Sequence, residues 1–186
     1  EDLAQEMEKR KEELMTISVQ EGGKPWNDTK VEVNRAIEGV KMAAHYMHEM
    51  KGEEVVTDLM ERGAGRKAFT LKEPIGVVAS LSAFNHPINL AVHQIIPAVA
   101  VGTPVIFKPA PVTPRSGKRI IELLHGCGLP EAHAQYLLCS NENAERFSSD
   151  QRISYMSFIG SYKIGWYLRS RLSEGATCAL EHGGAA

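Results

Sequence analysis

Four polar side chains that follow apolar runs of the sequence could together bind an anionic or polyhydroxyl molecule. They are Asn85, Lys108, Ser161 and Glu181. A lysine at the rim of an apolar strand usually has an anionic or hydroxyl-bearing partner. Ser161 lies in a glycine-to-helix turn, GSYKIG, which can aim backbone N–H groups and a helix N-terminus at a pyrophosphate. We therefore expect a nucleotide site, although the GxGxxG fingerprint is absent from the sequence.

Each of these residues also has a purely structural interpretation. Lys108 could be an edge lysine whose ammonium reaches solvent, and Asn85 could be a turn residue ahead of Pro87. Ser161 could cap the helix that follows it, and Glu181 could be a surface carboxylate before a Gly-Gly turn. For any one residue the structural interpretation is the more common. Four such residues at one edge of a sheet favour a binding site instead.

An alternation of short apolar runs with helical segments begins at Pro74 and supplies the elements that would position these side chains. We expect strands at residues 76–81, 104–107, 135–139, 154–158 and 177–181, with helices between them. This order predicts an α/β fold: a Rossmann-like parallel sheet with helices on both faces. Ligands of such sheets bind beyond the carboxyl ends of the strands, where all four polar residues fall. Pro109 and Pro111 would hold the segment after Lys108 extended.

Two helices and a short hairpin precede this region. In the second helix, Thr29 and Glu32 form a T-x-x-E pattern, which predicts a capping box. Apolar residues recur behind it at helical spacing: Val33, Ala36, Ile37, Val40, Ala44 and Met47. The runs 55–56 and 68–71 flank a glycine-containing turn at 62–66 and predict a two-stranded hairpin. A hairpin this small is marginal unless something covers it.

The composition fits a soluble globular protein of one domain. The 186 residues are 43% hydrophobic and 24% charged, with a net charge of -2. A charge so close to zero gives no reason to expect a nucleic-acid partner, and no apolar run reaches the ~20 residues that a membrane helix needs. No targeting segment opens the sequence, and its three cysteines form no CxxC pair. We therefore expect a cytoplasmic protein with neither a disulfide framework nor a metal site.

The order of five motifs resembles that of the aldehyde dehydrogenase superfamily. The motifs are EPIGVVASLSAFNHPINL, IIPAVAVGTPVIFKPAPVTP, CGLPEA, FIGSYKIG and LEHGG. The earlier segments KEELMTISVQEGGKP and VEVNRA are similar to the family's N-terminal helices, so the resemblance covers essentially the whole sequence. It implies oxidation of a small-molecule aldehyde through a thiohemiacetal on a cysteine, hydride transfer to NAD or NADP, and hydrolysis of a thioester.

The resemblance also assigns roles to particular residues. It implies that Asn85 donates its side-chain amide to the oxyanion and that Glu181 is the general base. These roles suit an amide that cannot be titrated away and a partly buried carboxylate. The resemblance further implies that Lys108 contacts the adenosine ribose and that Ser161, with Gly160, holds the pyrophosphate. The remaining expected cofactor-binding positions are Ser82, Phe84, Pro111 and Gly165.

Three departures from the family pattern refine these expectations. Pro111 stands where NAD-preferring members often have a glutamate, three residues after the lysine. Since a carboxylate there would repel a 2′-phosphate, its replacement predicts use of both cofactors or a preference for NADP. His182 replaces the usual leucine and would alter the packing behind the nicotinamide. His86 would fill space or line the substrate tunnel, and we favour the first.

The family's nucleophilic cysteine lies well downstream of the motif that ends here in Gly184. We therefore interpret Cys127, Cys139 and Cys178 as small buried hydrophobic residues rather than nucleophiles. Residues 1–186 would then be an incomplete NAD(P)-binding domain without its catalytic domain, inactive alone. The hairpin, around residues 55–72, would be an arm that builds a homodimer or homotetramer. The alternatives are a CoA-acylating semialdehyde dehydrogenase and a non-catalytic nucleotide-binding or oligomerisation module.

Overall fold

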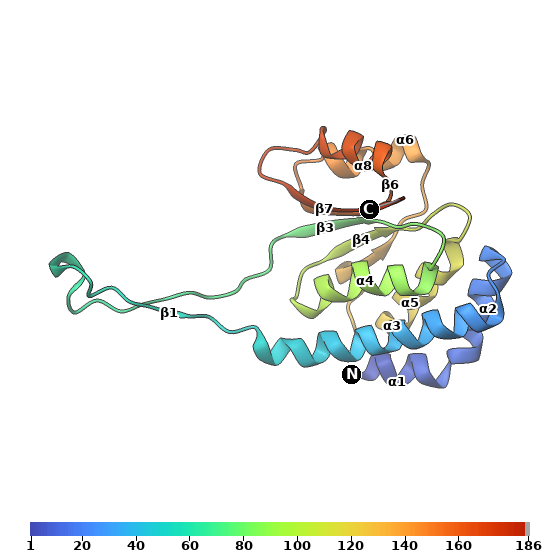
Figure 1. The fold of residues 1–186 in the computed structure, drawn as a ribbon, viewed down its shortest axis with the longest axis horizontal. Coiled ribbons are helices and arrows are strands. Elements are labelled where there is room, and N and C mark those ends of the chain that lie inside the picture. The colour runs from blue at the N-terminus through green and yellow to red at the C-terminus, as the bar shows by residue number, and fades with distance from the viewer. Residues whose placement is uncertain (185–186) are drawn as a thin grey trace.

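Five parallel strands form the central layer of the computed structural model, which describes residues 1–184 (Figure 1). The strands are β3 (Val77–Leu81), β4 (Val105–Lys108), β5 (Ala134–Tyr136), β6 (Ile153–Ser161) and β7 (Thr177–Gly183). They lie in the order β5-β4-β3-β6-β7, and all neighbouring pairs are parallel. This arrangement confirms the predicted Rossmann-like α/β sheet. From β3 the chain adds β4 and β5 on one side and then β6 and β7 on the other, so the strand order reverses between β3 and β6. Open parallel sheets bind ligands at such a point.

The lengths of β5 and β6 differ from those expected. β6 continues through Ile159, Gly160 and Ser161 because β7 provides a parallel partner for each of them, and Ser161 pairs with Gly183. β5 ends at Tyr136, where its pairing with β4 also ends. The neighbouring strand, rather than the length of the apolar run, therefore sets where these strands stop.

Helices cover both faces of the sheet (Figure 1). On one face lie α4 (Pro87–Ala100) and α5 (Pro114–Gly126), over which α1 (Asp2–Lys9), α2 (Lys11–Gly22) and α3 (Trp26–Tyr46) form a further layer. The other face carries α6 (Asn141–Ala144), α7 (Arg146–Ser149) and α8 (Tyr162–Arg169). Short 3-10 turns occur at Met47–Glu49, Glu61–Gly63 and Glu131–His133. Every helix within residues 1–184 is too short or too polar to span a membrane.

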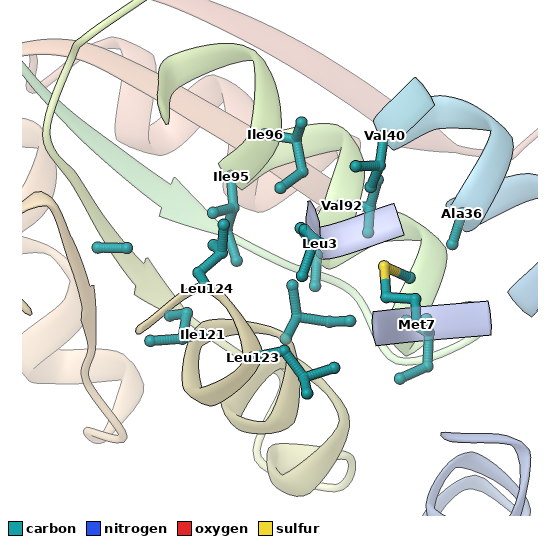
Figure 2. Packing of buried hydrophobic residues seen from close by; sticks show 14 of the residues in the cluster. Leu3, Met7, Ala36, Val40, Val92, Ile95, Ile96, Ile121, Leu123 and Leu124 are labelled. Atoms are coloured by element: carbon teal, nitrogen blue, oxygen red, sulfur yellow. The ribbon is translucent and has the colours of Figure 1, made fainter. Parts of the chain in front are cut away.

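Two apolar clusters hold these layers together. The larger joins the sheet to α1–α5, and Figure 2 shows Met7 of α1, Val40 of α3, Ile95 of α4 and Leu124 of α5 converging in it. The smaller joins the sheet to α6–α8 and includes Met156, Phe158 and Leu168. Each fully buried aliphatic side chain contributes about 1.5–3 kcal/mol.

The predicted capping box at Thr29 and Glu32 is wrong. Because α3 begins at Trp26, both residues lie inside the helix, and the Thr29 hydroxyl donates to the carbonyl oxygen of Pro25 at 3.0 Å. Thr29 and Glu32 instead belong to the buried stripe of α3, in line with Val33 and Ala36. The Glu32 carboxylate contacts a different helix, α4.

Residues 51–75 form an arm that extends away from the sheet (Figure 1). Within it, β1 (Glu54–Val55) and β2 (Ala68–Phe69) pair antiparallel, so the predicted hairpin exists but is shorter than expected. The turn between them includes Gly65 with a φ of 76°, a conformation that glycine adopts without strain. The arm exposes large apolar side chains: Val56, Leu59, Met60, Phe69 and Leu71.

Candidate functional site

A cavity at the carboxyl edge of the sheet collects most of the predicted ligand-binding residues. It has a volume of about 310 Å³ and lies between the ends of β3, β4 and β6 and the helices α6 and α8. Six predicted residues line it: Ser82, Phe84, Lys108, Pro111, Gly160 and Ser161. Apolar side chains, among them Ala144, Ile164 and Leu168, complete its walls. A mostly apolar hollow with a few polar groups is typical of a small-molecule site, and we name it the edge cavity.

Lys108 is the buried cation of the edge cavity. Its residue is 5% exposed, and its ammonium donates to Asn141 Oδ1 at 3.3 Å and to the carbonyl oxygen of Pro109 at 3.4 Å. Burial lowers the pKa of Lys108 below its ordinary value. Within residues 1–184 no carboxylate lies at ion-pair distance from this ammonium. Its three N–H donors are therefore suited to hydroxyl or phosphate oxygens of a ligand.

The N-terminus of α8 opens at the same cavity without a side-chain cap. Ser161 occupies the N-cap position, and its side chain makes no capping hydrogen bond. The first N–H groups of a helix have no intrahelical acceptor, and together with the helix dipole they attract an anion. This end of α8 therefore meets the requirements of a phosphate site.

The helices that follow β3, β4 and β5 are capped by side chains. At the start of α5, the two carboxylate oxygens of Glu21 accept hydrogen bonds from the backbone N–H groups of Arg115, at 2.7 Å, and Ser116, at 2.8 Å. Glu32 does the same for α4, and the Ser140 hydroxyl accepts the N–H of Asn143 in α6. Of the helices α4, α5, α6 and α8, only α8 has first-turn N–H groups without a side-chain acceptor among residues 1–184.

Gly165 does not line the edge cavity but allows α8 to sit close to the sheet. A Cβ at this position would lie 2.4 Å from Nε2 of His182 and 3.1 Å from the Phe158 ring. Gly160 has a similar role, since a Cβ there would lie 2.6 Å from the same ring. The two glycines are therefore required by packing, which positions the N-terminus of α8 over β6.

The other two predicted residues, Asn85 and Glu181, lie outside the edge cavity. Asn85 is exposed, between β3 and α4. Glu181 is exposed on β7 and lines a second hollow, the face cavity, of about 540 Å³ between α3, α4 and the strands β6 and β7. Successive strand residues point to opposite faces of a sheet, so Glu181 is turned away from the side where α8 lies. The four residues share one edge but not one pocket.

His86 belongs to a network that the sequence did not predict. Its Nδ1 accepts a hydrogen bond from the ammonium of Lys24, which also donates to Glu32 Oε2 at 2.9 Å. Glu32 is 2% exposed, and its Oε1 accepts the N–H groups of Ile88 and Asn89 at 2.8 and 3.2 Å. The expectation that His86 fills space or lines a tunnel missed this network. One signal was available: a carboxylate on the apolar stripe of a helix needs buried partners.

His182 and the three cysteines pack against neighbouring side chains. The His182 ring stands edge-on to Trp166, with 5.6 Å between the ring centroids, under α8. Cys127, Cys139 and Cys178 are free thiols that are partly buried, not fully buried as expected, and none of them lines the edge or the face cavity. Burial raises the pKa of the Cys127 thiol, which disfavours its nucleophilic thiolate form. Residues 1–184 contain no cluster of three or more side chains that could hold a metal ion.

Comparison with known proteins gives one consistent result. A sequence model of the aldehyde dehydrogenase family matches residues 1–186. The 3-sulfolactaldehyde dehydrogenase of Priestia aryabhattai is 36% identical over 87% of this chain and 34% of that protein. The lactaldehyde dehydrogenase of Methanocaldococcus jannaschii is 31% identical over 98% of this chain and 39% of that protein.

Solved structures share the fold. Aldehyde dehydrogenase 21 from Physcomitrella patens, in complex with the reaction product succinate, matches with a TM-score of 0.94 at 35% identity, over 100% of this chain and 38% of that one. The NADP-dependent glyceraldehyde-3-phosphate dehydrogenase from Bacillus halodurans C-125, complexed with NADP, gives 0.93 at 29% identity, over 98% of this chain and 39% of that one. This chain thus spans between 34% and 39% of the length of these relatives.

Proposed function

Because this chain belongs to the aldehyde dehydrogenase family, we propose that it provides the nicotinamide cofactor site of an enzyme that oxidises an aldehyde to a carboxylic acid through a cysteine thioester. Hydride acceptance is the chemistry that NAD or NADP supplies when bound. The observation that carries the proposal is the uncapped N-terminus of α8 beside the buried ammonium of Lys108, in one cavity. Residues 1–186 are then an incomplete cofactor-binding domain, and the nucleophilic cysteine and catalytic domain come from sequence outside them.

Two groups of the edge cavity fit an adenine dinucleotide. The N–H groups at the start of α8 bind the pyrophosphate, with Gly160 allowing the helix to approach the Phe158 ring and the sheet. When the nucleotide binds, the Lys108 ammonium exchanges its long hydrogen bonds to the oxygens of Asn141 and Pro109 for hydrogen bonds to the ribose hydroxyls. Ser82, Phe84 and Pro111 line the same wall. The absence of a carboxylate at Pro111 leaves room for a 2′-phosphate, so the enzyme uses both NAD and NADP.

Asn85 and Glu181 act on the substrate from outside the edge cavity. The Asn85 amide donates an N–H to the oxygen that becomes negative when a thiolate attacks the aldehyde carbon. The Glu181 carboxylate takes a proton from the water that hydrolyses the thioester, and its exposure in the face cavity gives water access to it. Their separation from the edge cavity keeps the acyl chemistry apart from the nucleoside.

The substrates named for the relatives favour a small polar aldehyde as the substrate of this enzyme. The relatives include enzymes for 3-sulfolactaldehyde, lactaldehyde and sulfoacetaldehyde, and a structure with bound succinate. We propose a short aldehyde that carries a hydroxyl or an anionic group. A turnover screen of the full-length protein with lactaldehyde, 3-sulfolactaldehyde and benzaldehyde tests this: a preference for benzaldehyde contradicts it.

The arm joins subunits in the proposed enzyme. Its exposed apolar side chains and its two-residue strands cannot stabilise a hairpin alone. A second copy of the chain would cover this surface in a homodimer or homotetramer. Sedimentation of the full-length protein, with and without Leu59→Asp and Phe69→Asp, tests whether the arm is the contact.

The cofactor site is tested most directly by Lys108→Met in the full-length enzyme. Loss of the ammonium should raise the Kd of both NAD and NADP by about tenfold or more, since hydrogen bonds from charged groups contribute about 1.5–3 kcal/mol. Lys118→Met, at an exposed position of α5 outside the cavity, is the control and should bind normally. Equal cofactor affinity in Lys108→Met and the wild type would refute the assigned site.

A further inference from the structure

We propose that Glu145 is a cofactor specificity residue that disfavours a 2′-phosphate on the nucleotide. The inference rests on the proposed function, because it concerns the nucleotide that the edge cavity binds. Glu145 lines that cavity, although 37 residues of sequence separate it from Lys108, which shares the same walls. It therefore brings to the cavity the carboxylate that is missing at Pro111.

The position of Glu145 is fixed by a hydrogen bond across the cavity. The Tyr167 hydroxyl of α8 donates to Glu145 Oε2 at 2.9 Å. This bond raises the pKa of Tyr167, so the phenol remains a donor at neutral pH. Tyr167 occupies one Glu145 oxygen, which leaves Oε1 as an acceptor for a ligand. Within residues 1–184 Glu145 has no cation at ion-pair distance, and its negative charge is not neutralised by a direct contact.

The geometry of the cavity sets which part of a nucleotide meets Glu145. Along α8, Ser161, Ile164 and Tyr167 all line the cavity, so it runs from the uncapped helix N-terminus to the hydrogen bond between Tyr167 and Glu145. On the opposite wall, Asn141 accepts from Lys108 and stands four residues, about one helical turn, before Glu145.

A nucleotide with its pyrophosphate at Ser161 and its ribose hydroxyls at Lys108 therefore turns its 2′ position toward the wall that carries Glu145. A 2′-hydroxyl can donate to the free oxygen of Glu145. A 2′-phosphate brings close to two negative charges toward the same oxygen, which costs free energy in a partly buried cavity. Lys108 attracts that phosphate and Glu145 repels it, so the balance between them sets the ratio of NAD to NADP affinity.

Titration of ADP and 2′,5′-ADP into the full-length enzyme separates these contributions. Glu145→Gln keeps the acceptor for Tyr167 and removes only the charge. It should tighten the binding of 2′,5′-ADP by at least about threefold, and more at low than at high salt, while the Kd of ADP stays the same or rises. Glu142→Gln is the matched control, because Glu142 is exposed on α6 and does not line the cavity.

Each outcome is decisive. A higher affinity for 2′,5′-ADP in Glu145→Gln, but not in Glu142→Gln, supports the proposal. An unchanged ratio of the two dissociation constants, or an equal change in Glu142→Gln, overturns it while leaving the proposed function intact. If the wild type binds neither nucleotide, the proposed function fails, and this inference fails with it.

Discussion

The carboxylate of Glu32 on α3 accepts the backbone N–H of Ile88 on α4 at 2.8 Å, although 56 residues separate the two in the sequence. The same oxygen accepts the N–H of Asn89, so one buried side chain caps the first turn of another helix. Lys24 balances the charge and also contacts His86, which precedes α4. This network ties the N-terminal helices to the turn that carries Asn85.

Glu32→Gln should lower the free energy of unfolding by about 2–4 kcal/mol, because it leaves the Lys24 ammonium without its buried partner and weakens two charge-assisted hydrogen bonds. Urea unfolding of the chain measures the change. Glu38→Gln on the same helix is the control. Glu38 is exposed and, among the residues that the structure describes, pairs only with Lys41, so the loss should stay below about 1 kcal/mol. Similar losses in both variants would show that the cap contributes little.

The lowered pKa of Lys108 predicts two opposite effects of alkaline pH. Nucleotide binding needs the ammonium, so affinity should fall as the pH rises through the lowered pKa, before the ordinary value of 10.5 is reached. In the unfolded chain the amine holds its proton more tightly. The contribution of Lys108 to the free energy of unfolding should therefore increase with pH between the lowered pKa and 10.5.

Both slopes can be measured by ADP titration and by urea unfolding at a series of pH values. Lys108→Met should remove them, because methionine does not titrate. If this variant keeps the pH dependence of the wild type, another group is responsible.

Glu181→Gln should slow hydrolysis of the thioester and leave hydride transfer largely intact. In the full-length enzyme the steady-state rate should fall by about 100-fold or more, with the initial burst of reduced cofactor retained. Stopped-flow absorbance resolves the two phases, and Glu174→Gln, at an exposed position, serves as the control. Loss of the burst would assign Glu181 to an earlier step. An unaffected rate would favour a CoA thiol over water as the acyl acceptor.

Gly165→Ala should destabilise the contact between α8 and the sheet, because its methyl group would meet the His182 ring. We expect a loss of about 1–3 kcal/mol, typical of overpacking, together with weaker ADP binding. Gly126→Ala is the control, since a Cβ there meets nothing within 4 Å, and it should be neutral or stabilising. Adding His182→Ala should restore part of the stability. Without such a rescue, the steric explanation is wrong.

The edge cavity could be anticipated because it depends on local rules. A strand that is recognised by its apolar run ends at a definable residue, and parallel strands bring their carboxyl ends to one edge. Lys108, Gly160 and Ser161 follow from that rule alone. Glu181 reaches the same edge but the opposite face from α8, because side chains alternate along β7, where Glu181 pairs with Ile159. Asn85 is exposed in the turn between β3 and α4.

Glu145 and Glu32 could not be placed from the sequence in this way. Glu145 enters the edge cavity only because α6 and α8 pack on the same face of the sheet, where Tyr167 holds its carboxylate. Glu32 follows a capping pattern that its own helix does not use, since α3 begins before Thr29. In both cases the position of the carboxylate depends on a partner far away in the sequence.

The parallel α/β fold, the family and the polar residues at the strand ends could be predicted from the amino-acid sequence, since apolar periodicity and the residues that end a strand are properties of sequence neighbours. Which helix N-termini lack a side-chain cap, and which carboxylates share a cavity, became clear from the three-dimensional structure. Those outcomes depend on hydrogen bonds between residues far apart in the chain, and their formation is favoured only after the apolar faces have packed and excluded water.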